Sequence, residues 1–165
     1  MMHWNPDIMA HCTLMRSKKQ PFIITGNSVL DDRGVVRFVN DFSFTGVKRF
    51  YHIENHSPDI IRAFHGHKKE AKYLYVALGS ALICTVCMDN FKNPSPSLSI
   101  DRWIVSSQKP QVLYVPPGYA NGIKHLTPDT QVIIYSTASL SDSLKDDYRY
   151  PYDYWGTDCW EINNR

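Results

Sequence analysis

The stretch from Arg62 to Lys72 holds the residues that could most directly do chemistry. Two imidazoles, His65 and His67, stand one residue apart, and the cation Lys72 follows five residues after the second. In an extended strand, side chains two positions apart point to the same face, so both imidazoles would serve one site. A His-x-His pair in a β framework indicates either a metal site or an acid/base site. The other residues of the site decide between these interpretations.

The further ligands that a metal would need are missing. In the small-barrel proteins called cupins, a Glu follows His-x-His and precedes a Gly by seven positions, and a second motif places a His beyond Pro-x-Gly. Counted back from Gly79, the Glu position holds Lys72, and the His position after Gly118 holds Asn121. An ammonium and an amide cannot replace those ligands in a tight divalent site. The sequence therefore predicts the cupin framework without its metal ion, and we expect no other cofactor.

Size and charge set further bounds. A chain of 165 residues suits one domain with a full core, which we expect to span residues 1–165. The net charge of +2 is spread along the chain, so no basic stripe indicates nucleic acid. No apolar run approaches the roughly 20 residues that span a bilayer, and the first residues lack the pattern of a secretion signal. We expect neither a nucleic acid nor a membrane as partner.

The cysteines favour a reducing compartment. Cys84 and Cys87 share one apolar strand, where alternation places them on opposite faces. A redox pair instead favours the amino terminus of a helix. We therefore expect buried or half-buried thiols and a cytoplasmic protein.

Short strands separated by Gly and Pro turns dominate the rest of the chain. Periodicity and strand-forming residues predict strands near 22–25, 35–39, 47–54, 71–78, 80–88, 102–106, 111–115 and 131–136, with a helical turn within 141–149. Residues 1–21 form an arm without a clear period. Many short strands at regular spacing predict an all-β fold, a sandwich or barrel with short peripheral helical turns.

The carboxy-terminal segment, residues 141–165, is rich in aromatic residues. Its rings concentrate between Tyr148 and Trp155. They could pack against one end of the barrel, or they could form a platform for a sugar or base ring.

Arg62 and His65 raise a geometric difficulty. Strict alternation sends residues three positions apart to opposite faces of a strand. If both serve one site, a β-bulge must lie near Ala63-Phe64.

An ordered set of motifs resembles a known family. It comprises Asp32-Arg33-Gly34, Glu54-Asn55-His56-Ser57, Arg62-x-x-His65, Lys72, and Gln111 to Gly122 with its Pro-x-Gly turn. This set resembles the dTDP-4-dehydrorhamnose 3,5-epimerases, metal-free cupins with a jelly-roll fold that act on nucleotide-linked 4-keto-6-deoxy sugars. The stretches 47–51 and 62–69 are also similar to the related 3,4-ketoisomerases.

The resemblance implies roles for individual residues. A proton next to a ketone is weakly acidic, so its removal needs a base of near-neutral pKa and a group that holds the enolate charge. The family's catalytic His falls on His65, with His67 beside it. Lys72 and Arg62 would meet the enolate or the diphosphate. A carboxylate of the carboxy-terminal segment would orient His65, with Asp153 as the first choice and Asp147 as the second.

The resemblance also implies substrate-binding residues. These are Arg62, Arg33, Asn121 and Tyr114, with Arg33 matching an arginine that contacts the nucleotide.

The chain departs from the epimerase pattern in three ways. Asn121 replaces a His, Ala63 replaces a Gly, and the positions of the family's catalytic Tyr hold Ser139 and Leu140. Loss of that phenol weakens the case for epimerisation at two centres. A single-centre epimerase, or a ketoisomerase with two histidines on one face, would not need this phenol. Lys72, however, stands where those ketoisomerases carry Gln.

Three functions therefore remain open. The first is a metal-independent epimerase acting at C3, C5 or both in deoxysugar and polysaccharide biosynthesis. The second is a nucleotide-4-keto-6-deoxyhexose 3,4-ketoisomerase, and the third is a non-catalytic nucleotide-sugar-binding cupin. The resemblance also implies a homodimer in which amino-terminal strands cross over.

Overall fold

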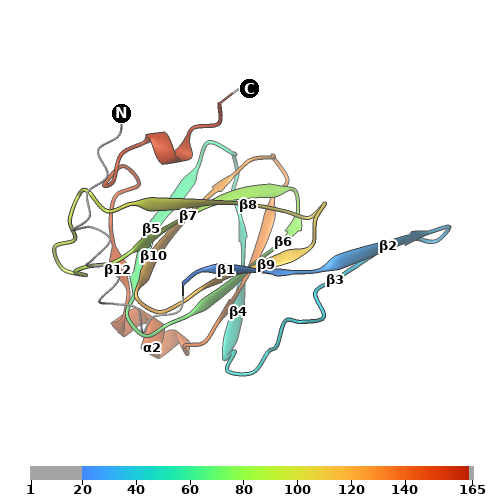
Figure 1. Ribbon diagram of the computed structural model, residues 1–165, viewed down its shortest axis with the longest axis horizontal. Coiled ribbons are helices and arrows are strands. Elements are labelled where there is room, and N and C mark those ends of the chain that lie inside the picture. Colours follow the sequence, from blue (N-terminus) through green and yellow to red (C-terminus); the bar gives the residue numbers. More distant parts are fainter. Residues whose placement is uncertain (1–19, 164–165) are drawn as a thin grey trace.

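The computed structural model describes residues 20–163, about half of which lie in antiparallel strands (Figure 1). The strands are β1 (Phe22–Thr25), β2 (Asn27–Asp31), β3 (Gly34–Phe38), β4 (Arg49–Glu54), β5 (Ile61–His67), β6 (Lys72–Leu78), β7 (Ser80–Cys87), β8 (Ile100–Ser106), β9 (Gln111–Val115), β10 (Tyr119–His125), β11 (Gln131–Ser136) and β12 (Tyr148–Arg149). A short helix, α2 (Leu140–Lys145), and a 3₁₀ turn, η1 (Asp158–Trp160), lie near the carboxy terminus. The expected all-β fold is confirmed. Nearly all of the expected amino-terminal arm lies outside the described residues.

Two five-stranded sheets form the body of the fold. The first sheet has the order β1-β9-β6-β11-β4, and the second has the order β12-β5-β10-β7-β8. Strands β2 and β3 form a separate hairpin that projects away from both sheets (Figure 1). Within residues 20–163, no helix has the length and apolar content needed to cross a membrane.

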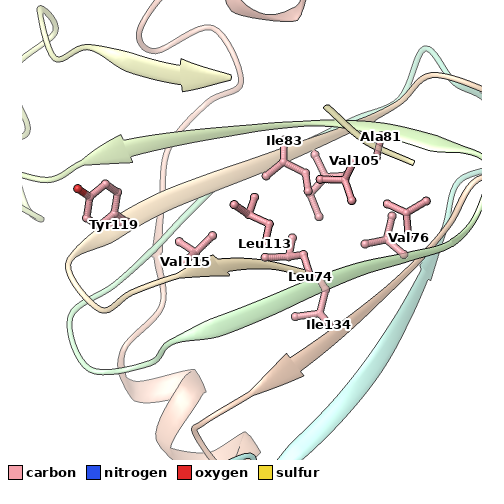
Figure 2. Close-up of a cluster of buried hydrophobic side chains, with 11 residues drawn as sticks. Leu74, Val76, Ala81, Ile83, Val105, Leu113, Val115, Tyr119 and Ile134 are labelled. Atoms are coloured by element: carbon pink, nitrogen blue, oxygen red, sulfur yellow. The ribbon is translucent and has the colours of Figure 1, made fainter. Parts of the chain in front are cut away.

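The core lies between the two sheets (Figure 2). Leu74 and Val76 of β6 meet Ile83 of β7 and Ile123 of β10 in one buried cluster. Each strand contributes every second residue, as period-two alternation requires. This alternation defines the inner face of each sheet, and polar residues on the inner faces lie beyond one end of the apolar cluster.

The carboxy-terminal segment covers the outer face of the second sheet. Its rings join a second buried cluster around Phe64, and their polar atoms are bonded to backbone carbonyls. Tyr150 Oη donates to the Phe91 carbonyl at 2.7 Å, and Trp155 Nε1 donates to the Ser95 carbonyl at 2.9 Å. The packing interpretation of these rings is therefore confirmed.

Strand β10 was missed by the sequence analysis, although it lies in the centre of the second sheet. Its Asn121-Gly122 pair is typical of a turn. Here the glycine instead permits close packing, because a Cβ on Gly122 would lie 2.4 Å from Ala63 Cβ and 2.7 Å from the Trp160 ring.

Candidate active site

The register of β5 and β10 brings Arg62 and His65 to one face. Arg62 pairs with Ile123, and His65 pairs with Asn121. Strand β10 advances by two residues between these partners while β5 advances by three, so β5 carries one extra residue at 63–64. Paired residues share a face, and positions 121 and 123 lie on the same, inner face. The expected bulge is confirmed.

His65 contacts a carboxylate from the carboxy-terminal segment. Strand β12 pairs with β5 so that Arg149 stands opposite His65, and Asp147, two positions earlier, shares that face. His65 Nδ1 lies 3.0 Å from Asp147 Oδ1, and Arg149 Nε donates to Asp147 Oδ2 at 2.7 Å. A carboxylate at Nδ1 keeps the ring proton there, so Nε2 carries the lone pair of the neutral ring.

Asp153 is not the partner of His65, which corrects the first choice made from the sequence. Asp153 is exposed and lies in a turn in which Gly156 N donates to its backbone carbonyl at 2.9 Å. Strand β12 ends at Arg149, so the chain has left the edge of β5 before it reaches residue 153. The second choice, Asp147, is the carboxylate that contacts His65.

His67 and Lys72 form a buried pair next to His65. Lys72 Nζ lies 2.9 Å from His67 Nε2, and Asp147 Oδ1 lies 4.0 Å from the same nitrogen. Asp147 therefore stands between the two imidazoles. Leu74 and Val76, which follow Lys72 at alternate positions of β6, belong to the inner cluster, so Lys72 also points inward.

A second buried carboxylate, Glu70, stands behind this pair. Its Oε1 accepts from Ser136 Oγ at 2.8 Å and lies 3.4 Å from Arg49 Nη2. Its Oε2 lies 3.3 Å from His67 Nδ1. The register aligns Arg49, Ser136 and Lys72 across β4, β11 and β6, so neighbouring strands of the first sheet bring these groups together.

Burial controls the charge of the inner pair. It lowers the pKa of Lys72, and Glu70 and Asp147 act in the opposite direction. Burial followed by the nearby Lys72 ammonium lowers the pKa of His67. Tyr51 on β4 faces the same charges, and burial together with Glu70 raises its pKa to about 12. Such perturbed groups gather at functional sites.

The pKa of Asp147 falls despite its partial burial. Burial acts to raise the pKa, but the hydrogen bonds from Arg149 and His65 outweigh it. Asp147 therefore stays ionised beside His65.

Asp146 holds the turn that separates the two inner residues. Its carboxylate accepts from the backbone N–H of Lys68 at 3.0 Å, Lys69 at 2.7 Å and Glu70 at 3.3 Å. The two adjacent carboxylates therefore have different roles. Asp146 fixes the backbone of the turn, and Asp147 contacts the imidazoles.

Arg62 and Asn121 share the inner face with His65. Arg62 Nε donates to Asn55 Oδ1 at 2.7 Å, which holds the guanidinium near one edge of the site. Asn121 is buried and pairs with both His65 and Thr85.

Two predicted binding residues lie elsewhere. Tyr114 pairs with Tyr73 and stacks near Phe22 on the outer face of the first sheet, because its neighbour Val115 takes the inward position opposite Lys72. The prediction for Tyr114 is wrong within one copy of the chain. Arg33 lies in the exposed turn of the β2–β3 hairpin, ion-paired with Asp31, and this hairpin projects away from the sheet that contains β5 (Figure 1).

Helix α2 begins at the positions where the family pattern has its catalytic tyrosine. Ser139 is its N-cap, and Ser139 Oγ accepts from Asp142 N at 3.2 Å. The positions of the missing tyrosine, Ser139 and the exposed Leu140, thus begin this helix.

The chemistry of the donor set fits a proton-transfer site better than a metal site. In residues 20–163, no group of three or more His, Cys, Asp or Glu side chains is arranged to hold a metal ion. The ammonium of Lys72 lies directly on the imidazole that a metal would need.

Glu70 and Arg49 were missed by the sequence analysis. Glu70 follows Lys68 and Lys69, and such a charged run is typical of a solvated turn. Its one distinguishing signal was its position, three residues after His67 and two before Lys72.

Comparison with known protein families decides the relationship. Residues 18–150 match the family described as dTDP-4-dehydrorhamnose 3,5-epimerase. The chain belongs to this family. The match covers β1 to β12, so His65, Lys72 and Asp147 all lie within the matched part of the chain.

Two individual proteins show the similarity, one in sequence and one in structure. The chain is 30% identical over 98 residues to the spore coat polysaccharide biosynthesis protein SpsL of Bacillus subtilis (strain 168), a match spanning 58% of this chain and 63%, less than two thirds, of SpsL. A dTDP-4-dehydrorhamnose 3,5-epimerase from Sulfolobus tokodaii superposes with a TM-score of 0.66 at 22% identity, over 81% of this chain and 78% of that one.

A sugar 3,4-ketoisomerase also shares the fold. The enzyme from Thermoanaerobacterium thermosaccharolyticum, solved in complex with TDP, superposes with a TM-score of 0.61 at 18% identity, over 82% of this chain and 92% of that one. At these identities the two superpositions establish the cupin-type fold of this family and no more.

Proposed function

We propose that this chain is an isomerase that epimerises a nucleotide-linked 4-keto-6-deoxy sugar at C3, C5 or both. The observation that carries the proposal is the contact between His65 and Asp147, at 3.0 Å, beside the buried Lys72. Membership of the epimerase family supports the substrate class. The nucleotide and the sugar then follow from the family and not from any contact of this chain.

In the proposed reaction, His65 Nε2 removes the proton next to the ketone. The C–H electrons move onto the ketone oxygen, and the cations Lys72 and Arg62 hold the resulting enolate charge. Asp147 stabilises the imidazolium that forms on His65. A solvent proton added to the other face of the carbon completes the epimerisation, and His65 then releases the proton that it took to the solvent. Lys72 and Asn121 occupy the positions of metal ligands, which supports a mechanism that needs no metal.

Solvent deuterium tests the proposal. Incubation of TDP-4-keto-6-deoxyglucose with the protein in D₂O should place deuterium at C3 or C5, as read by NMR and mass spectrometry. His65→Asn should slow this exchange by about 10²-fold or more, because an amide cannot take the proton. Exchange by the variant at the wild-type rate would refute the assignment of His65.

A 3,4-ketoisomerase is the second candidate, and one observation favours it. His65 and His67 both lie within 4.0 Å of Asp147 on one face, and the tyrosine positions begin a helix. Two bases on one face suit the movement of a proton between neighbouring carbons. A product whose ¹³C carbonyl signal has moved from C4 to C3 would identify this activity. Tight TDP binding without deuterium uptake from any keto sugar would identify the third candidate, a binding protein.

The working unit is proposed to be a homodimer. The β2–β3 hairpin projects from the body, and its Leu30 and Val36 are exposed at 77% and 64%. A second copy would cover these side chains and would place Arg33 near the partner subunit. The cytoplasm stays our proposed location, on the cysteine positions in the sequence alone.

A further inference from the structure

Two buried atoms of the inner cluster face one another without a hydrogen-bond partner. They are His67 Nδ1 and Glu70 Oε2, and they lie 3.3 Å apart. Both residues are almost completely buried, at 4% and 3% exposure. Buried polar atoms are almost always bonded, and these two atoms, a possible donor and an acceptor, already lie close to hydrogen-bond distance of one another. One small rotation of either side chain would join them.

This geometry restricts the proton of His67. A Lys72 ammonium can only donate, so the nitrogen that meets it at 2.9 Å, His67 Nε2, must then carry the lone pair. The single ring proton is then on Nδ1 and points at Glu70. If the proton instead moves from Lys72 to His67, both ring nitrogens carry protons and Nδ1–H still points at Glu70. The two states differ by the transfer of one proton across 2.9 Å.

We infer that Glu70 is a positioning residue of the active site, which orients His67 so that His67 and Lys72 share one proton. This inference rests on the proposed isomerase function and deepens it. Lys72 Nζ then gives a proton to the ketone oxygen while His65 takes the proton from carbon. The C–H and Lys72 N–H bonds break, and O–H and His65 N–H bonds form. When a solvent proton reaches the other face of the carbon, the O–H proton returns to Lys72 and His65 releases its proton to the solvent.

The other contacts of Glu70 offer a purely structural explanation for its burial. Experiment can distinguish this explanation from a positioning role. Glu70 Oε1 binds Ser136 and approaches Arg49, and these contacts alone would justify a buried carboxylate. They use only Oε1, however, and leave Oε2 directed at His67. A role restricted to packing would not need that second oxygen.

The charges around the pair come from several elements. His67 faces Lys72, Glu70, Asp147 and Asp146. Lys72 faces Glu70, Asp147 and Arg49. The carboxylates favour the protonated pair, and Arg49 opposes it. Substitution of Glu70 and of Arg49 should therefore move the titration of the pair in opposite directions.

Histidine NMR tests the inference without substrate. In the ¹⁵N-histidine-labelled full chain, long-range ¹⁵N–¹H spectra should show neutral His67 protonated on Nδ1 and not on Nε2, assigned with His67→Gln. Glu70→Gln should disturb this pattern. A neutral ring protonated on Nε2 would overturn the inference, whatever the activity of the enzyme. Since the tautomer is read from the wild-type protein, the test survives a Glu70→Gln variant that fails to fold.

Enzyme kinetics provides a second test of the role of Glu70. Glu70→Gln should lower kcat for deuterium exchange by about 10²-fold with little change in KM, and should move the limb of the pH profile that belongs to the pair to lower pH. Arg49→Gln, which removes a partner of the other oxygen, should move that limb to higher pH. Loosening of the fold would admit water and shift both variants upward, and that result would refute the positioning role. If wild-type protein shows no exchange, the proposed function fails while the NMR result still decides the tautomer.

Discussion

The carboxylate of Asp147 lies against the imidazole of His65, with Oδ1 3.0 Å from Nδ1. This contact joins the segment that leads into the edge strand β12 to the bulged strand β5, and it keeps the ring proton on Nδ1 so that Nε2 carries the lone pair. Asp147→Asn keeps the size of the side chain but removes the charge that stabilises the imidazolium. We expect deuterium exchange to fall by about 10²- to 10⁴-fold.

The matched control for Asp147 is Asp153→Asn. Asp153 is exposed and makes no contact with His65, so its variant should exchange at the wild-type rate. An equal loss in both variants would contradict the assignment of Asp147.

Stability should fall as the pH drops below the ordinary range of histidine. The pKa of His67 is lowered, first by burial and then by Lys72. In the unfolded chain His67 takes up a proton near pH 6.5, whereas in the folded chain it does so only at lower pH. The stabilisation from neutral His67 is thus present above about pH 6.5 and is lost as the pH falls towards the folded value.

Urea titrations at a series of pH values between about 7 and 5 check this linkage. His67→Gln should flatten the dependence of the free energy of unfolding on pH. Burial also lowers the pKa of His125, which contributes in the same direction, so His125→Gln provides an independent comparison. Unchanged slopes in both variants would contradict the linkage.

Arg62 should contribute to binding more than to proton transfer. Its guanidinium is held by Asn55 and lies on the inner face beside the bulge. Arg62→Gln should weaken TDP binding by about 1.5–3 kcal/mol, the range for a hydrogen bond to a charged group, as measured by calorimetry. Lys48→Gln removes an exposed cation that pairs only loosely with Asp142 and should leave TDP affinity unchanged.

The β2–β3 hairpin should decide the oligomeric state. Leu30→Asp places a charge on its most exposed apolar side chain and should convert a dimer into a monomer in light scattering. Ile104→Asp makes the same change at another exposed apolar position, on the edge strand β8, and should leave the dimer intact. A wild-type protein that is monomeric at micromolar concentration would contradict the proposed dimer.

Features that depend on local periodicity could be predicted from the sequence. Alternation alone revealed that Arg62 and His65 needed a bulge, and the register of β5 with β10 contains it. The same rule, applied to β9, would have turned Tyr114 away from Lys72 once Val115 was recognised as the inward residue.

Features that depend on contacts between residues distant in sequence could not be predicted from the sequence. Both Asp147 and Asp153 follow the last long strand, and only the pairing of β12 with β5 distinguishes them. Gly122 resembles a turn residue until Trp160 is seen packed over it. Glu70 has the local sequence of a solvated turn, and its burial depends on Ser136, 66 positions away.

The two neighbouring aspartates have a consequence for biosynthesis. Asp146 clamps the backbone between the two inner residues, and Asp147 completes the contact with His65, yet both lie after the last long strand of the barrel. A nascent chain that has emerged only as far as β11 can pair its long strands but has neither clamp nor carboxylate. We therefore expect competence for proton transfer only after the segment that follows β11 has been synthesised and has docked onto β5.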